Sequence, residues 1–402
     1  MLLALLACAP KVAPVPPQEN PLLLWELQRE GKTSHLLGTC HLGVPLDYAL
    51  PEPHDRVLDE ARVVYTEAEL DMDDVGRLFR LVWSDGPGLS ERIPDDRWRA
   101  VAIAVRDQMP APFFEHLEPW VLASMVPMFA AKSFDRAKEA MDLEIQKRAK
   151  ARGIRMAHVE TLEEQAAMLR AFDDAFLADL GPSEEDGAAQ TEALTALCLR
   201  ADTSVADVLL DPGDPTSEAL LATRNRAWVP NLLPDLKEGG ALVAVGAAHV
   251  LGDAGLLALL SAEGFTVRQL TTTRPVTGER MPAMSARIAP APPLPPGIEA
   301  FEAQMASALP AALCAEGQLV RKCFEPDLAR CTERLAADTR LCVRQHADLL
   351  PADGSAPSED VVKRLGGCVP GGLMIEAIAR DRVGDAPMCR MIEGMMQSAA
   401  GK

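Results

Sequence analysis

The twelve residues Ala241–Gly252, ALVAVGAAHVLG, carry five apolar residues, a glycine, a histidine and a second glycine in that order. A short apolar run bounded by a turn residue is typical of a buried strand, and Gly246 permits a tight bend after it. His249 follows three residues beyond that glycine, so we expect it just past the strand end. This stretch predicts a strand, a turn and a helix, which together form the basic unit of an α/β fold.

A second stretch near the N-terminus repeats this pattern. In Leu36–Gly43, LLGTCHLG, Gly38 follows apolar residues and His41 stands three residues further on. Open α/β sheets place their sites beyond the ends of strands, and neutral imidazole is both a common metal ligand and a ready general base. We therefore expect His41 and His249 to converge at one sheet edge. The alternative is that both histidines only cap strand-to-helix turns.

Further apolar runs predict the rest of a central mixed sheet. Most of the chain between residues 67 and 154, and again between 162 and 236, has a helical period instead. The sequence therefore predicts an α/β fold whose short strands are separated by long helical insertions. The other expected strands are Leu22–Leu27, Ser34–Gly38, Val63–Glu67, Ile154–Val159 and Phe265–Leu270, with a hairpin turn at Gln28–Thr33.

Two carboxylates and an Arg–Asn pair are the other candidate site residues. Glu67 ends an apolar strand, which is a pattern that delivers a carboxylate to a site. Glu160 ends another strand, where it either joins that site or caps the helix beginning at Thr161. Arg224 and Asn225 lie on a predicted long helix. In so acidic a chain, Arg224 either neutralises a carboxylate or binds an anionic intermediate in the same pocket, or forms a surface ion pair.

The cysteines divide the chain into two parts. A Pro-rich run, Ala289–Gly297, cannot form a helix or central strand, so we place a linker at 274–297 between a body at 22–273 and a module at 298–402. The module has a helical composition, and six cysteines in it predict three disulfides; zinc is the other reading, although no CxxC is present. We expect Cys40 and Cys198 to stay reduced, because neither has a neighbouring cysteine in sequence. The six are Cys314, Cys323, Cys331, Cys342, Cys368 and Cys389.

The N-terminus resembles an export signal. Leu5–Cys8, LLAC, is similar to a bacterial lipobox, and residues 9–21 form a Pro-rich stretch that suits a tether. The sequence thus predicts a lipoprotein-type signal at 1–8, a lipidated Cys8 that anchors the protein to a membrane, and an extracytoplasmic location. A short apolar start on a cytoplasmic protein is the alternative. The net charge of −19 over 402 residues argues against a nucleic-acid partner.

Eight segments, taken in their order along the chain, together resemble the TraB/GumN family, which is related to the Tiki metalloproteases. The resemblance covers about Leu22–Leu270 and leaves the six-cysteine module outside. The segments are Leu24–Leu27, Leu36–Gly43, Val63–Glu67, Pro119–Trp120, Met141–Asp142, Val159–Thr161 with Glu164–Gln165, Arg224–Asn225 with Trp228, and Val245–Gly252.

The resemblance implies an α/β fold with a metal-dependent hydrolase site. It implies that His41, His249 and Glu67 hold a divalent metal, with Glu67 also the candidate base, and that Arg224 and Asn225 support them. Such ligands suit Mn, Co, Fe or Zn. A peptide or small-molecule substrate follows from this reading. One alternative is a non-catalytic envelope lipoprotein that binds haem, a metal or a small ligand in the same pocket; another is a structural envelope protein whose module docks a partner.

Overall fold

The computed structural model describes residues 19–40, 44–69, 75–130, 140–181, 188–205, 218–275, 277–281, 288–351, 353, 355–379 and 382–400. Its centre is a six-stranded mixed sheet with strand order β4-β3-β5-β2-β1-β6. The predicted α/β fold with a central mixed sheet is therefore confirmed. The strands are β1 (Asn20–Arg29), β2 (Lys32–Thr39), β3 (Val63–Thr66), β4 (Arg155–His158), β5 (Ala241–Gly246) and β6 (Thr266–Thr272).

One side of the sheet is antiparallel and begins with a hairpin. Strands β1 and β2 pair with Leu24 opposite Leu37, and β6 pairs antiparallel with β1. The hairpin turns through Glu30 (φ 49°) and Gly31 (φ 74°). Two successive residues with positive φ match the right-handed twist of the flanking strands.

The other side of the sheet is parallel, and this arrangement positions the candidate site. Strand β5 pairs parallel with both β2 and β3, and β4 pairs parallel with β3. The carboxyl ends of these four strands therefore lie along the same edge. The chain leaves that edge after Thr39, Thr66, His158 and Gly246.

Helices cover the sheet and bury its apolar residues. Helix α13 (Arg224–Glu238) packs against β2 and β5. Its buried residues Trp228, Leu232 and Leu236 recur every four positions, which places them on one face. The other helices of this part are α1 (Arg56–Asp59), α7 (Met141–Ala151), α8 (Leu162–Arg170), α10 (Ala188–Arg200), α14 (Ala247–Val250) and α15 (Leu256–Ala262), with short helical turns η1 (Leu46–Tyr48), η3 (Thr203–Val205) and η4 (Glu218–Thr223).

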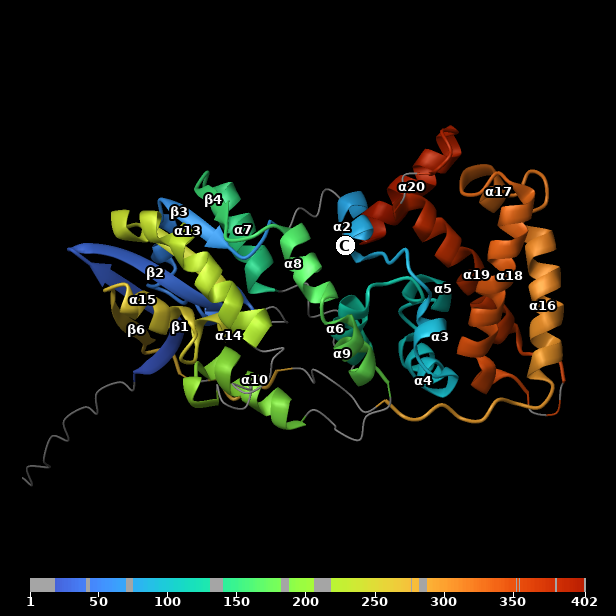
Figure 1. Ribbon diagram of the computed structural model, residues 1–402, viewed down its shortest axis with the longest axis horizontal. Helices are drawn as coiled ribbons and strands as arrows, with labels where there is room; N and C mark the ends of the chain where they lie inside the picture. Colours follow the sequence, from blue (N-terminus) through green and yellow to red (C-terminus); the bar gives the residue numbers. More distant parts are fainter. Residues whose placement is uncertain are drawn as a thin grey trace, which may run out of the picture.

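The long insertion after β3 forms a helical layer with its own apolar core. That core includes Trp98, Phe114 and Leu122, which are buried. Figure 1 shows these helices between the sheet and the C-terminal helices. They are α2 (Val75–Val82), α3 (Leu89–Arg92), α4 (Asp95–Val105), α5 (Ala111–Phe114) and α6 (Pro119–Ala130), joined by α9 (Asp173–Asp179).

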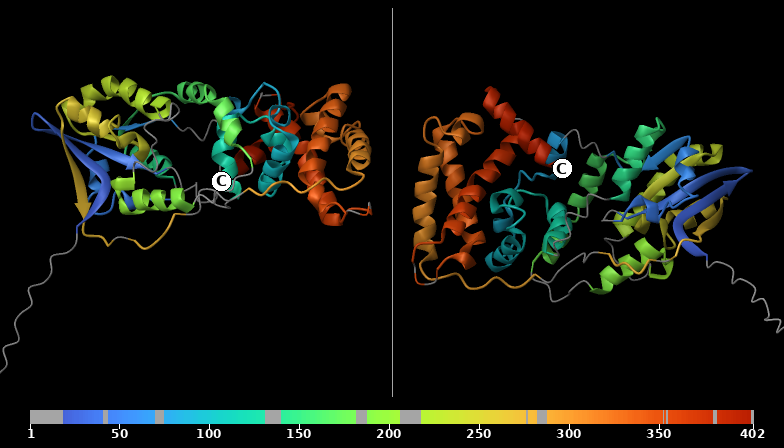
Figure 2. Two further views of the ribbon diagram at one scale, coloured as in Figure 1. Left: turned by 60° about the horizontal axis from the view of Figure 1, so that its bottom comes forward. Right: turned by 180° about the vertical axis from the view of Figure 1, so that it is seen from behind.

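The C-terminal part is helical and packs on that insertion. Helices α18 and α19 both contact α5, and α18 also contacts α4. The two further views show the same arrangement, with the sheet and the C-terminal helices at opposite ends (Figure 2). The elements are α16 (Ile298–Leu313), α17 (Leu319–Cys323), α18 (Leu328–Gln345), η5 (Ala347–Leu349), α19 (Glu359–Ala379) and α20 (Pro387–Ala400).

The structure confirms three disulfides in the C-terminal part and adds a fourth elsewhere. The three bonds are Cys314–Cys331, Cys323–Cys389 and Cys342–Cys368. The prediction that Cys40 and Cys198 stay reduced is wrong, because they form a disulfide with Cα atoms 6.1 Å apart. Helix α10 packs against β1, beside β2, so the fold brings together two cysteines that are 158 residues apart.

The disulfides indicate an oxidising, extracytoplasmic environment, because such bonds are rare in cytosolic proteins. Within the described residues, no helix is both long enough and apolar enough to cross a membrane. Cys8 and the predicted tether lie outside the described residues, apart from the last residues of the tether.

Candidate functional site

Glu67 leaves the end of β3 and is held at the carboxyl edge of the sheet. Its Oε1 atom accepts a hydrogen bond of 2.9 Å from the backbone N–H of Gly246, at the end of β5. Its Oε2 atom accepts one of 3.3 Å from Gln165 Nε2 on α8. Two adjacent strand ends thus fix this carboxylate.

Glu160 lies in the same cluster and does not cap α8. Thr161 is the N-cap of that helix and forms a capping box with Glu164. The Glu160 carboxylate instead accepts hydrogen bonds from the Arg224 guanidinium and from Trp228 Nε1, the latter at 3.2 Å. Of the two readings that the sequence left open for Glu160, the structure supports a place in the cluster.

Arg224 is the centre of the cluster. It begins α13, directly after η4. Its Nη2 atom donates to Glu67 Oε2 at 2.9 Å and also to Glu160, and its Nε atom donates to Glu160 at 3.1 Å. The guanidinium carbon lies 4.7 Å from the centre of the Trp228 ring, within the range of a cation–π contact. The Arg224 side chain is only 12 % exposed, so it forms a buried ion-pair network and not a surface pair.

Asn225 fixes the orientation and the tautomer of His249. Its Nδ2 group donates to two backbone carbonyls, those of His249 (3.2 Å) and Ala254 (2.9 Å). Its Oδ1 atom must therefore be the acceptor that lies 2.8 Å from His249 Nδ1, which places the proton on Nδ1. Arg224 Nη1, which can only donate, lies 3.0 Å from Nε2, so Nε2 presents a lone pair to the site and the ring is neutral.

Trp228 completes the wall behind these groups. Its ring centre lies 4.4 Å from that of His249, and it is itself buried. No role for Trp228 follows from the sequence beyond its place in the family resemblance. Its position four residues after Arg224 on α13 is the feature that marks Trp228 as a neighbour of the site, because residues four apart share one helix face.

Gly38 is the glycine that precedes the first predicted histidine. A Cβ atom at this position would lie 3.4 Å from Cα and Cβ of Ala247, which begins α14. A Cβ atom here would thus be in van der Waals contact with Ala247, so Gly38 lies close to the start of α14. His41, the first of the two predicted histidines, lies outside the described residues.

The donor set can accommodate a divalent metal in its chemistry. His249 Nε2 carries a lone pair and lies 3.9 Å from Glu67 Oε2, and imidazole with carboxylate is a donor set used by Mn, Co, Fe and Zn. An oxygen that accepts from the other ring nitrogen is the usual support for a ligating histidine, and Asn225 supplies it. Within the described part of the chain, no three His, Cys, Asp or Glu side chains gather in a metal-binding group. Metal binding would require Arg224 to give up its contact with Nε2.

The charges of the described groups leave this cluster negative. Glu67 and Glu160 supply two negative charges, Arg224 supplies one positive charge, and His249 is neutral. Their side chains are between 5 % and 12 % exposed.

The comparison with protein families identifies the α/β part. The model of the TraB/PrgY/gumN family matches residues 23–269, more than half of the chain. The chain therefore belongs to this family, which confirms the predicted resemblance. No curated protein and no solved structure matches the chain.

Proposed function

We propose that this protein is a metal-dependent hydrolase of the cell envelope that acts on peptides or similar amides. The observation that supports it most is the fixed tautomer of His249. Asn225 accepts from Nδ1–H and leaves Nε2 unprotonated, 3.9 Å from Glu67 Oε2 and at present bonded by Arg224. His249 and Glu67 would hold the metal together with His41. A divalent metal bound there would polarise a substrate carbonyl and lower the pKa of a water molecule.

The chain's own groups would then divide the work of hydrolysis. Glu67 is the base, because its carboxylate can accept a proton at Oε2, which faces the site. Arg224 would donate to the developing oxyanion by exchanging one of its present acceptors for it, because its five N–H groups are already bonded to Glu67, Glu160, His249 Nε2 and the Leu220 carbonyl. Asn225 is a positioning residue that acts through the imidazole.

Metal content and peptide cleavage together test this proposal. The purified full chain is stripped with a chelator and reloaded separately with Mn, Co, Fe or Zn. Bound metal is measured by mass spectrometry, and cleavage is followed on a mixed peptide library. We expect one metal equivalent and metal-dependent cleavage, with His249→Ala losing the metal and Glu67→Gln losing the cleavage.

Glu163→Gln is the matched control for Glu67→Gln. Glu163 is a carboxylate on α8 that pairs with Arg77 at the surface, outside the cluster. This variant should retain both metal and cleavage. If the wild-type chain binds none of the four metals and cleaves no peptide, the hydrolase proposal is wrong.

A second candidate function is non-catalytic binding of haem, a metal or a small ligand in the same pocket. The observation that favours it is the position of Arg224, which bonds both carboxylates and His249 Nε2 at once. A cluster of donors and acceptors arranged in this way could hold a ligand without turnover. Titration with haem, followed by its absorbance, separates the two functions: binding without any cleavage supports this candidate.

Membrane anchoring through a lipidated Cys8 is part of the proposal and has its own test. The lipobox-like sequence at Leu5–Cys8 and the Pro-rich stretch after it motivate the anchor. Mass spectrometry of the natural protein should find an N-terminal Cys8 that carries acyl chains. An intact and unmodified Met1 would contradict the anchor and leave the hydrolase proposal untouched.

A further inference from the structure

A cavity of about 370 Å³ lies between the inserted helices and the C-terminal helices, away from the sheet. One wall comes from α3, α4 and the residues after α5, and the other from α16 and α18. This volume is within the usual range for small-molecule pockets. None of its lining residues belongs to the cluster around Arg224.

The cavity wall carries a buried carboxylate whose hydrogen bonds are incomplete. The Asp338 side chain is only 2 % exposed, and its Oδ2 atom has no hydrogen-bond partner among the described residues. Burial raises the pKa of this carboxyl group to about 7. A buried polar atom that lacks a partner costs about 1–3 kcal/mol, so its retention calls for an explanation.

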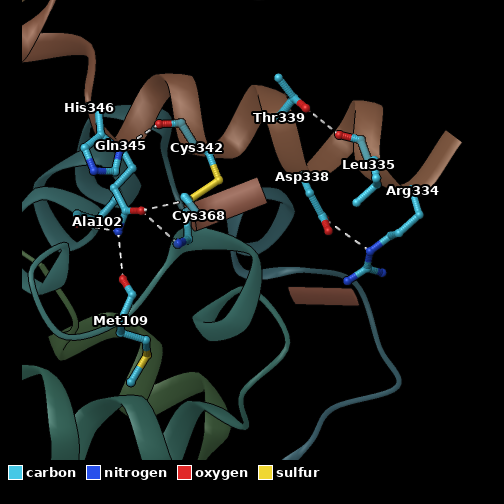
Figure 3. Close-up of a disulfide and its surroundings, with 11 residues drawn as sticks. Ala102, Met109, Arg334, Leu335, Asp338, Thr339, Cys342, Gln345, His346 and Cys368 are labelled. Atoms are coloured by element: carbon cyan, nitrogen blue, oxygen red, sulfur yellow. Dashed lines mark hydrogen bonds and ion pairs between the residues drawn. A yellow bond between two sulfur atoms is a disulfide. The ribbon is translucent and has the colours of Figure 1, made fainter. Parts of the chain in front are cut away.

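Arg334 lies beside Asp338 and is incompletely bonded in the same way. Its Nε atom lies 3.1 Å from Asp338 Oδ1, as the ion pair in Figure 3 shows. Within the described part of the chain, neither Nε nor Nη2 has a hydrogen-bond partner. Its Nη1 atom lies 3.2 Å from Glu376 Oε2, a second charged neighbour.

The other buried acids of the cavity are already bonded. Glu115 accepts from the Ser90 backbone N–H at 2.9 Å and from Trp98 Nε1 at 2.8 Å. Glu302 accepts from Arg344 Nε at 3.2 Å. The unused bonding capacity is therefore concentrated on Arg334 and Asp338. These two side chains present hydrogen-bond donors and an acceptor, with opposite charges, side by side.

We propose that this cavity binds a small zwitterion of the amino-acid class. Its carboxylate would accept hydrogen bonds from the Arg334 guanidinium, and its ammonium group would donate to Asp338 Oδ2. Trp98 and Leu341, which also line the cavity, would contact its side chain. A simple anion would leave Asp338 without a partner, and a metal cation would be repelled by Arg334. A zwitterion satisfies both groups together.

Binding to the full-length wild-type chain is the first test. The twenty protein amino acids are added singly, and the thermal unfolding midpoint and the heat of binding are measured. We expect at least one of them to raise the midpoint. The analogues of that amino acid that lack the ammonium or the carboxylate group should each bind roughly tenfold more weakly or worse. If none of the twenty binds, or if either analogue binds equally well, the proposal is overturned.

A charge-removing variant provides the second test. Asp338→Asn keeps the shape of the side chain and removes its charge, so binding should weaken roughly tenfold or more. Asp360→Asn is the control, because Asp360 is exposed on α19 and pairs with Arg364. It should bind as the wild type does. Unaltered binding by Asp338→Asn would contradict the proposal, and if that variant does not fold, the analogue series on the wild type decides. Neither test depends on the hydrolase proposal.

Discussion

Asn225 is a single residue on which the geometry of the candidate site depends. It is 1 % exposed and makes three hydrogen bonds, two to backbone carbonyls and one to His249. Asn225→Ala leaves these groups buried without partners, and we expect it to lower the free energy of unfolding by about 2–3 kcal/mol in urea titrations. Nitrogen NMR of His249 should show loss of the pure Nδ1–H tautomer, which a purely structural role would not change.

Asn20→Ala is the control for this prediction. Asn20 is also buried, but its side chain donates one hydrogen bond, of 2.7 Å, to the carbonyl of Arg274. Its loss should cost about 1 kcal/mol and leave the His249 tautomer unaltered. Equal costs for both variants, with the tautomer retained in each, would contradict the positioning role of Asn225.

Asp338 also predicts a pH dependence of stability. Burial raises its pKa from 3.8 to about 7; Arg334 opposes the rise, and the charges of Glu376 and Glu115 add to it. Between these two values the folded state binds more protons than the unfolded state, so this group stabilises the fold at low pH. Its contribution is lost as the pH rises towards 7, at roughly 1 kcal/mol per pH unit.

Urea unfolding between pH 4 and pH 8 checks this sign. Asp338→Asn should lack the contribution and become more stable relative to the wild type as the pH rises. Glu333→Gln removes an exposed carboxylate from the same helix and serves as the control. A wild type that gains stability relative to Asp338→Asn between pH 4 and pH 7 would show that the pKa of Asp338 is not raised.

At the scale of elements, the Cys40–Cys198 disulfide links the end of β2, at the carboxyl edge of the sheet, to helix α10. Cys40 follows directly after β2, and Cys198 lies near the end of α10. The bond closes a span of 158 residues, whereas Cys314–Cys331 closes 17. Because a longer span loses more chain entropy, the Cys40→Ser/Cys198→Ser double variant should lose about 5 kcal/mol of stability and the shorter pair about 3.

Urea titration of the two double variants compares these losses directly. Hydrogen exchange should also rise in α10 and at the end of β2 for the first pair only. The opposite order of stability, with the 17-residue bond worth more, would show that chain entropy does not govern these bonds.

The strands could be predicted from local pattern, whereas the pairing of distant residues could not. All six strands overlap the predicted ranges. The clearest cases are β3 and β5, which are buried at every residue and coincide with continuous apolar runs. The link between Cys40 and Cys198 depends on how α10 folds back, and no local pattern encodes that. For the same reason, the sequence could not decide whether Glu160 belongs to the site or caps a helix. That choice depends on its contact with Arg224, which is 64 residues away in sequence.

At the scale of the whole molecule, Gln345 joins the C-terminal helices to the inserted helices. It is fully buried at the end of α18. Its Oε1 atom accepts from the backbone N–H of Ala111 at 2.8 Å, and its Nε2 atom donates to the carbonyls of Ala102 and Met109, both at 3.0 Å (Figure 3). One side chain thus satisfies three backbone groups that belong to the other part of the protein.

Gln345→Ala therefore tests whether the two helical parts form one folding unit. The variant leaves one N–H and two carbonyls buried without partners, so we expect a loss of about 2–4 kcal/mol in urea titrations. Gln269→Ala is the control, because Gln269 gives one hydrogen bond, of 2.9 Å, to the carbonyl of Leu22 on the sheet. That variant should lose about 1 kcal/mol. If the hydrogen bonds of Gln345 join the two helical parts, amide hydrogen exchange in both α5 and α18 should be faster in Gln345→Ala than in the wild type. Unaltered exchange in α5 would show that apolar packing alone joins the two parts.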